Sequence, residues 1–121
     1  MGDGMVANPD LGQNPDIIKY TPLTISASGT TSDAANTFGN TPIALYMPGA
    51  FTGTALTFLV SHDGSAWVTA QKDGEDYTEE ASASQMIPLD PQVMAGVNHL
   101  KVVSNGTEAA QRVIQLACRP V

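Results

Sequence analysis

Residues 55–71 read Ala-Leu-Thr-Phe-Leu-Val-Ser-His-Asp-Gly-Ser-Ala-Trp-Val-Thr-Ala-Gln, and this stretch predicts a β-hairpin with one apolar face. In its first arm Leu56, Phe58 and Val60 recur at a period of two, which is typical of a half-buried strand. The Asp-Gly pair at 63–64 supplies the turn, because glycine adopts a positive φ without steric cost. We expect Trp67 to return to the face of Val60 and to join Phe58 in the core, where an aromatic ring removes about 150 to 250 Å² from water.

The rest of the chain continues this strand pattern, with turn residues at short intervals. Including both arms of the hairpin, we expect about eight strands, at residues 23–26, 43–47, 55–61, 67–71, 76–78, 85–89, 98–103 and 112–118. Helical periodicity is nearly absent, so the predicted fold is all-β, an antiparallel β-sandwich of jelly-roll type. The exception is a single helical turn that begins after the capping residue Asp90, with Pro91 at its first position. In the loop of residues 28–41 we expect Phe38 to be buried.

The length of 121 residues predicts one sandwich domain, residues 17–121, preceded by an N-terminal arm, residues 1–16. The arm is rich in Gly, Asn, Asp and Pro, a composition that cannot bury itself. It is either a flexible terminus or an extended segment that becomes ordered on a partner, with Met5, Val6 and Leu11 as its apolar contacts. Because ordering the backbone costs about 1 to 2 kcal/mol per residue, only a substantial contact would hold the arm in place.

The charge of the chain argues against several classes of partner. Its formal net charge is −7, and its five basic residues are scattered, whereas binding to nucleic acid depends on clustered Lys and Arg. No apolar run approaches the roughly 20 residues that span a bilayer, and the start of the chain lacks the pattern of a signal peptide. We therefore expect no nucleic-acid partner, no membrane partner, and synthesis in the cytoplasm without export by that route.

Residue types that carry nucleophilic catalysis are present, but their spacing does not fit a catalytic site. Ser61, His62 and Asp63 are consecutive, and consecutive strand and turn residues cannot form a hydrogen-bonded relay. Cys118 shares an apolar face with Ile114 and is interpreted as a small core residue rather than a nucleophile. The sequence therefore predicts no catalytic residues and a protein that is not an enzyme.

The candidate metal ligands are also interpreted as solvated side chains. His62 and His99 have no ligand spacing between them. An acidic cluster surrounds one turn, and calcium binding there is the alternative to a solvated edge; its members are Asp73, Glu75, Asp76, Glu79 and Glu80. The cluster does not match an EF-hand loop, so we expect no metal and no cofactor.

The hairpin and one later strand resemble a known group of folds. The segment Ser61-His62-Asp63-Gly64-Ser65-Ala66-Trp67, followed by the strand Asn98-His99-Leu100-Lys101-Val102-Val103, is similar to the galactose-binding-like jelly rolls, in which an Asp-Gly turn precedes a core tryptophan. The resemblance covers roughly the C-terminal two thirds of the chain. It implies a carbohydrate-binding module as one functional alternative, with Tyr46 and Tyr77 as a candidate glycan platform.

A second resemblance accounts for more features of the chain. The segments Met47-Pro48-Gly49-Ala50-Phe51-Thr52-Gly53-Thr54 and Ile87-Pro88-Leu89-Asp90-Pro91 look like those of the small β-proteins that decorate, or cement, the capsids of tailed phages. This resemblance implies a non-enzymatic virion protein on the capsid exterior, which bridges subunits of the major capsid protein as a symmetric homo-oligomer. The contacts expected with that partner are Met5, Val6, Leu11 and Tyr20, together with the loop residues Phe51 and Met94.

Overall fold

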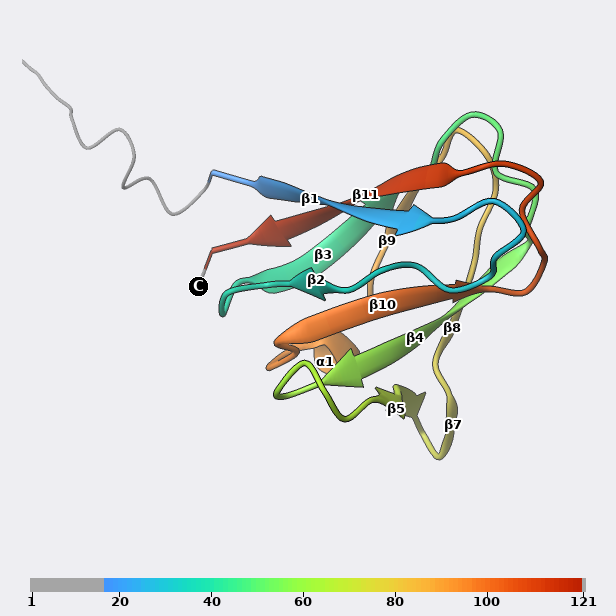
Figure 1. Cartoon of the computed structure of the whole chain (residues 1–121). Coiled ribbons are helices and arrows are strands. Elements are labelled where there is room, and N and C mark those ends of the chain that lie inside the picture. Colours follow the sequence, from blue (N-terminus) through green and yellow to red (C-terminus); the bar gives the residue numbers. More distant parts are fainter. Residues whose placement is uncertain (1–16, 121) are drawn as a thin grey trace, which may run out of the picture.

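Short β-strands make up nearly all the regular structure, as the period-two alternation of the sequence predicts (Figure 1). The structure is a computed structural model, and it describes residues 17–120. Within this range the strands are β1 (Lys19–Ile25), β2 (Ala35–Asn36), β3 (Thr41–Tyr46), β4 (Ala55–Ser61), β5 (Val68–Thr69), β6 (Gln71–Lys72), β7 (Glu75–Asp76), β8 (Thr78–Glu80), β9 (Met86–Pro88), β10 (His99–Ser104) and β11 (Arg112–Arg119). The helix α1 is Pro91–Met94, and Asp90 caps it by accepting a hydrogen bond from the backbone N–H of Gln92, as predicted.

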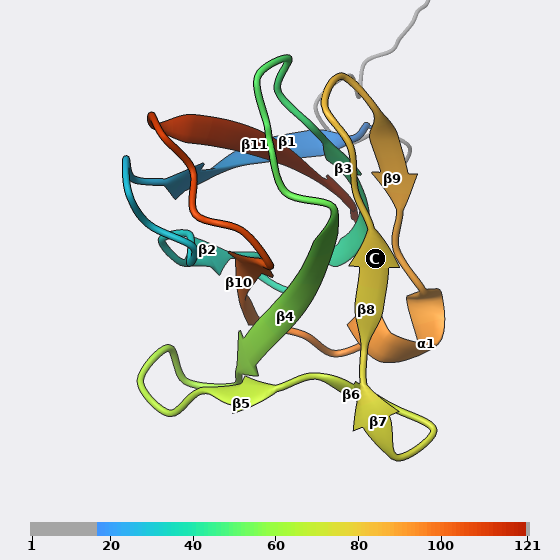
Figure 2. The ribbon, with the colours of Figure 1, turned by 90° about the vertical axis from the view of Figure 1, so that its right-hand side faces the viewer.

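The strands form a two-layered antiparallel sandwich, which confirms the predicted fold class (Figure 2). One sheet has the strand order β1-β11-β3-β9, and the other has the order β2-β10-β4-β5, with β8 also paired to β4. The eleven strands of residues 17–120 exceed the expected eight for two reasons: residues 68–80 form four short strands where two are expected, and β2 lies in the segment expected to be a loop. If β5 and β8 are treated as one interrupted strand and the β6-β7 hairpin as an excursion, the two sheets contain strands 1-8-3-6 and 2-7-4-5 of eight, the arrangement of a jelly roll.

The core lies between the two sheets and is filled by the inward-facing residues of the long strands. Leu23 of β1, Leu45 of β3 and Phe58 of β4 are fully buried, as are Ile25, Leu56, Met94, Leu100, Val102, Ile114 and Leu116. Full burial of such a side chain contributes about 1.5 to 3 kcal/mol. Cys118 is buried with them, as predicted.

The central hairpin is confirmed, but its register differs from the one expected. Val60 of β4 pairs with Val68 of β5, so Trp67 lies on the opposite face of the sheet from Val60. The prediction that Trp67 belongs to the core is therefore wrong, because a shift of one residue exchanges the two faces of a strand. Instead the indole lies under Lys101, whose Nζ is 4.5 Å from the ring centroid, and beside the ring of His99.

The prediction that Phe38 is buried is also wrong. Its side chain is 82% exposed at the tip of the turn between β2 and β3. The backbone hydrogen bond from Asn40 to Thr37 closes this turn, and the chain reverses direction before Phe38 can reach the core.

A buried ion pair ties together two loops at one end of the sandwich. The side chain of Glu108 is fully buried and accepts hydrogen bonds from the backbone N–H groups of Thr52 and Gly53, from the Thr52 hydroxyl and from Nε of Arg112 at 2.9 Å. Burial by itself raises the pKa of this carboxyl, but the guanidinium and the loop donors outweigh it and hold the pKa below its ordinary value. Glu108 therefore acts as the acceptor that fixes the loop after Phe51.

Candidate functional site

The outward face of the β1-β11-β3-β9 sheet carries the largest group of exposed apolar and aromatic side chains whose positions the strand register fixes. On β1 the residues Leu23 and Ile25 point inward, so the alternate residues point outward. The register aligns Tyr20 with Ala117, Ala44 and Pro88 in one row, and Pro22 with Gln115, Tyr46 and Met86 in the next. Thr24 and Val113 form a third row. We name these ten residues the uncharged face: Tyr20, Pro22, Thr24, Ala44, Tyr46, Met86, Pro88, Val113, Gln115 and Ala117.

Two tyrosines form the centre of the uncharged face. Tyr20 on β1 and Tyr46 on β3 stand on either side of β11, and their ring centroids are 6.0 Å apart with an interplanar angle of 67°. Two strand spacings amount to about 9.6 Å, so the rings lean toward each other across β11. The strand between them carries the small residue Ala117 at this point, which leaves room for the rings. A shallow depression lined by Tyr20, Tyr46 and Gln115 results.

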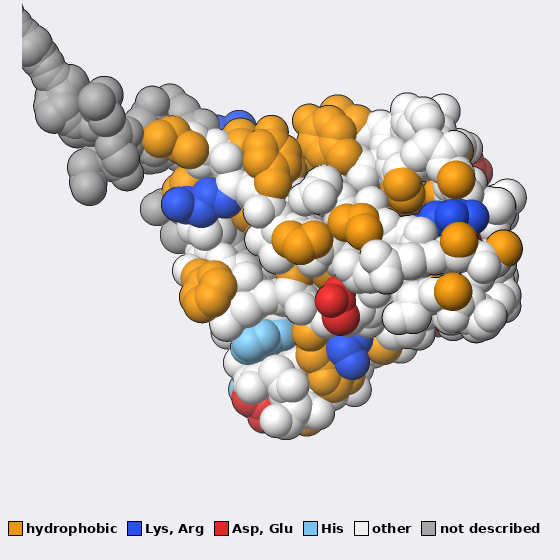
Figure 3. Space-filling view, turned by 45° about the horizontal axis from the view of Figure 1, so that its top comes forward, with side chains coloured by type: hydrophobic (Ala, Val, Ile, Leu, Met, Phe, Trp, Pro, Cys, Tyr) orange, Lys and Arg blue, Asp and Glu red, His pale blue; other side chains and the backbone are white. Residues whose placement is uncertain are grey.

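None of the ten residues of this face is Asp, Glu, Lys, Arg or His, although the chain has a formal net charge of −7. Within residues 17–120 the acidic side chains lie instead around the β6-β7 turn, on β8 and in the loops. Figure 3 looks toward the side where β1 and β11 lie and shows hydrophobic side chains spread among uncharged polar ones there, with Lys or Arg side chains at both ends. Docking on such a face neither brings carboxylates together nor requires an ion to lose its water. Exposed apolar patches of this kind are typical of interaction surfaces.

The edges of this sheet are poorly suited to pairing with another strand. On β1 the N–H of Thr24 donates to Asp33 Oδ1 at 2.8 Å, and the N–H of Asp33 donates to the carbonyl of Thr24, so this side of β1 is capped by a loop. By alternation Pro22, which has no N–H, presents its backbone to the same side. At the other edge β9 has three residues and ends at Pro88. The outward face of this sheet, rather than its edges, is available for contact.

The six residues expected to contact a partner differ in where they lie. Tyr20 is 57% exposed and lies on the uncharged face. Phe51 and Met94 are buried, so the expectation that they form surface contacts is wrong: Met94 extends from α1 into the core, and the loop fixed by Glu108 places Phe51 inside. Met5, Val6 and Leu11 lie outside the described residues.

The glycan platform expected from Tyr46 and Tyr77 is not formed. Tyr46 is exposed, but Tyr77 is buried and stacks on Phe58 with a centroid distance of 5.0 Å. The Tyr77 hydroxyl donates to Glu79 and accepts a hydrogen bond from the backbone N–H of Asp90. Burial, followed by the hydrogen bond to Glu79, raises the pKa of Tyr77 well above its ordinary value. Sequence reasoning missed Met86, Val113 and Gln115 as members of the uncharged face, although the alternation of β11 places the last two outward.

The candidate chemical groups are held in structural roles. Ser61 Oγ donates directly to Asp63 Oδ1 at 3.0 Å and accepts from the N–H of Gly64, so serine and histidine do not form a relay. The hydrogen bonds from the Ala66 and Ser65 N–H groups and from Ser61 hold the pKa of Asp63 well below its usual range. Burial raises the pKa of the Cys118 thiol to about 11, which disfavours a reactive thiolate. Between residues 17 and 120 no three His, Cys, Asp or Glu side chains converge as metal ligands.

Comparisons with known proteins leave the family of this chain undetermined. No protein-family model matches it, and no curated protein matches it. Among solved structures it is similar to the Yersinia pseudotuberculosis-derived mitogen, with a TM-score of 0.35 and 16% sequence identity over 88% of this chain and 87% of that one. In the part of the chain that the structure describes, no helix has the length and apolar character of a membrane span.

Proposed function

We propose that this chain is a non-enzymatic capsid decoration protein that binds the outside of a tailed-phage head through its uncharged face and thereby stabilises the shell. The observation that carries the proposal is the face itself, a group of aromatic, apolar and uncharged polar residues on a strongly acidic chain, bordered by Arg119 at the end of β11. The jelly-roll fold does not distinguish capsid decoration from carbohydrate binding, because both viral capsid proteins and lectins have this fold.

The size of the uncharged face favours binding to a lattice over formation of a single tight complex. Four strands about 4.8 Å apart and a length of about 20 Å give roughly 400 Å². A stable protein interface of standard size buries about 800 Å² per partner. Attachment of many copies to repeated sites nevertheless stabilises a shell, because each occupied site contributes RT ln(1 + [L]/Kd).

The position of Tyr20 links the face to the segment that precedes it. Tyr20 is the second residue of β1 and belongs to the uncharged face, so the described domain, which follows the arm of residues 1–16 in the sequence, begins near this surface. An arm of that length, with Met5, Val6 and Leu11, supplies the additional contact area that the face lacks. In this proposal the major capsid protein is the partner, and the decorating unit is a symmetric homo-oligomer on the virion exterior.

Co-sedimentation with empty heads of the virus whose genome encodes the chain tests this function. We expect the native protein to pellet with the heads and the double variant Tyr20→Ser/Tyr46→Ser to remain in the supernatant. The matched control is Trp67→Gln, which removes an aromatic ring from the outer face of the other sheet and should still pellet. Circular dichroism verifies that each variant is folded. Equal pelleting of the native protein and the double variant would contradict the role of the uncharged face.

The carbohydrate-binding alternative is separated from capsid decoration by a glycan array. Specific glycan binding that is lost in the same double variant would show that the ligand of the uncharged face is a sugar and not the capsid. The expected result is no specific binding to the array together with retention on heads.

A further inference from the structure

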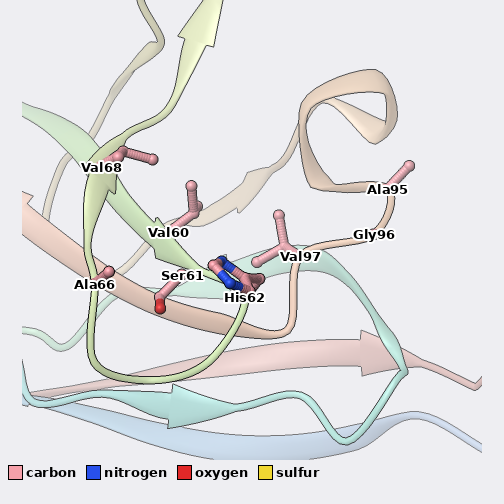
Figure 4. Close-up of a pocket in the computed structure, with 8 residues that line it drawn as sticks. All are labelled: Val60, Ser61, His62, Ala66, Val68, Ala95, Gly96 and Val97. Atoms are coloured by element: carbon pink, nitrogen blue, oxygen red, sulfur yellow. The ribbon is translucent and has the colours of Figure 1, made fainter.

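The end of the sandwich away from the Glu108 ion pair contains an apolar hollow. Its volume is about 320 Å³, and its lining is mainly apolar, with Val60, Val68 and Val97 as the largest such side chains (Figure 4). The remaining lining residues are Ser61, His62, Ala66, Ala95 and Gly96. The walls come from the β4-β5 hairpin and from the loop between α1 and β10, and Val68 is 63% exposed. An enclosed apolar cavity of about 150 Å³ already holds a benzene ring, so this hollow has room for an aromatic side chain.

The same end of the molecule also presents an aromatic side chain to solvent. Phe38 is 82% exposed, and its backbone has φ +51, in the left-handed region that bulky residues avoid. The next residue, Gly39, has φ +82, and the Phe38 N–H donates to the side chain of Asn36 at 2.8 Å. A turn with two successive positive φ values favours Asn, Asp or Gly at its first central position. A phenylalanine in that place costs stability, which points to a function for its exposed ring.

Hydrogen bonds place Phe38 close to the hollow. The residue before Phe38 is Thr37, whose hydroxyl donates to the carbonyl of Val97 at 2.8 Å and whose N–H donates to the carbonyl of Asn98. Across the sheet His99 of β10 lies between Asn36 of β2 and Ser61 of β4. The turn of Phe38 and the rim of the hollow are thus about two strand spacings, or about 10 Å, apart. Figure 1 shows these loops at one end of the sandwich.

From this arrangement we propose that two copies of the chain associate through this end, with Phe38 of each copy inserted into the hollow formed by Val60, Val68 and Val97 of the other. Because knob and hollow lie side by side on one surface, a single two-fold axis between them satisfies both contacts at once. This contact deepens the homo-oligomer of the proposed function by naming the surface that builds it, and it involves none of the residues of the uncharged face.

The charge of this surface and the area that it can bury are those expected of a weak self-association. The residues of the turn, 36–40, carry no charge, and no carboxylate is among the residues that line the hollow, so Phe38 and the hollow meet without an acidic group between them. The carboxylate of Asp63, which accepts hydrogen bonds from Ser61 and Ala66 of the lining, lies at the rim. Each phenylalanine buries about 150 to 250 Å². Two knobs and the walls they cover amount to about 600 to 1,000 Å² in total, below the roughly 1,200 Å² of standard interfaces. The dimer is accordingly weak and reversible on its own, and it leaves the uncharged faces of both copies free for a lattice.

Sedimentation equilibrium of the full chain from micromolar to millimolar concentration provides the first test. We expect the weight-average mass to approach twice that of the monomer at the highest concentrations. Phe38→Asn should remain monomeric, since asparagine suits the left-handed backbone and removes only the knob. Val68→Asp should also remain monomeric, because it places a carboxylate in the hollow. The control Tyr20→Ser/Tyr46→Ser should dimerise like the native chain, whether or not it still binds heads.

Fluorine NMR adds a readout at the knob itself. The chain contains three phenylalanines, and Phe51 and Phe58 are buried. In protein labelled with 4-fluorophenylalanine we expect the Phe38 resonance to shift with concentration while the other two stay constant, and the shift to vanish in Val68→Asp. A monomeric mass at every concentration, or a dimer that persists in Phe38→Asn, overturns the inference. Because neither measurement contains a capsid, failure here is distinct from failure of the proposed function.

Discussion

The buried ion pair between Glu108 and Arg112 allows a quantitative prediction about stability. The change is Glu108→Gln, which keeps the shape of the side chain and removes its charge. Arg112 is then left with a side chain that is only 12% exposed and without its carboxylate partner, and the donors of Thr52 and Gly53 lose their charged acceptor. Breaking a buried ion pair by removing one partner costs about 3 to 5 kcal/mol. We expect a loss near 3 kcal/mol, because some water still reaches Arg112.

Urea unfolding followed by tryptophan fluorescence measures this loss, since the chain has a single tryptophan. With an m value of about 2 kcal/mol per molar urea, a loss of about 3 kcal/mol lowers the midpoint by about 1.5 M. The matched control is Glu80→Gln, at an exposed carboxylate, which should change the free energy of unfolding by less than about 0.5 kcal/mol. The double variant Glu108→Gln/Arg112→Met should recover part of the loss, because it removes the unpaired cation.

The same variant has a defined pH dependence. The pKa of Glu108 is lower in the folded chain than its ordinary value of 4.5, so the folded state favours the carboxylate. Its contribution is complete above the unfolded pKa and is lost as the pH falls through the folded pKa. The stabilities of the native protein and Glu108→Gln should therefore converge as the solution is acidified below about pH 4.5. A difference under about 1 kcal/mol at pH 7, or one that stays constant on acidification, would refute the reasoning.

Three further predictions concern single positions. Gly53→Ala should destabilise the fold by about 1 to 3 kcal/mol, because the new Cβ would lie 2.3 Å from Ser104 Oγ, whereas Gly49→Ala, with its nearest contact at 3.5 Å, should unfold in urea nearly as the native chain does. In urea at pH 8, Cys118 should react with a thiol reagent only as fast as the chain unfolds, since burial raises its pKa to about 11. Rapid labelling of the native protein without urea would show that the thiol is accessible. Phe38→Asn should raise the free energy of unfolding by about 1 kcal/mol through relief of backbone strain, and a lower melting temperature would mean that the ring supports its own turn.

The positions of strands and turns could be predicted because they depend on neighbours in the sequence. The alternation around Phe58 located β4, and the Asp-Gly pair at 73–74 forms the turn between β6 and β7, with positive φ at both residues. The capping role of Asp90 likewise depends on a contact two residues away.

The faces onto which side chains project could not all be predicted from such local patterns. The predicted face of Trp67 is wrong because the hydrogen bonds of Ser61 and Asp63 set the length of the turn, and thereby the register of β5. Tyr77 follows a polar hairpin, and nothing in its neighbours indicates that its ring stacks on Phe58.

The sequence by itself determined that this protein is an all-β sandwich, since a period of two, turn chemistry and capping are local properties of the chain. Only the tertiary structure decided which exposed side chains act together. The uncharged face exists because the sheet places β1 beside β11, so that Tyr20 meets Tyr46 across a strand from the other end of the chain. In the same way, Phe38 comes near its hollow because Thr37 bonds to Val97, sixty residues away, and pairing at that distance depends on the packing of the whole sandwich.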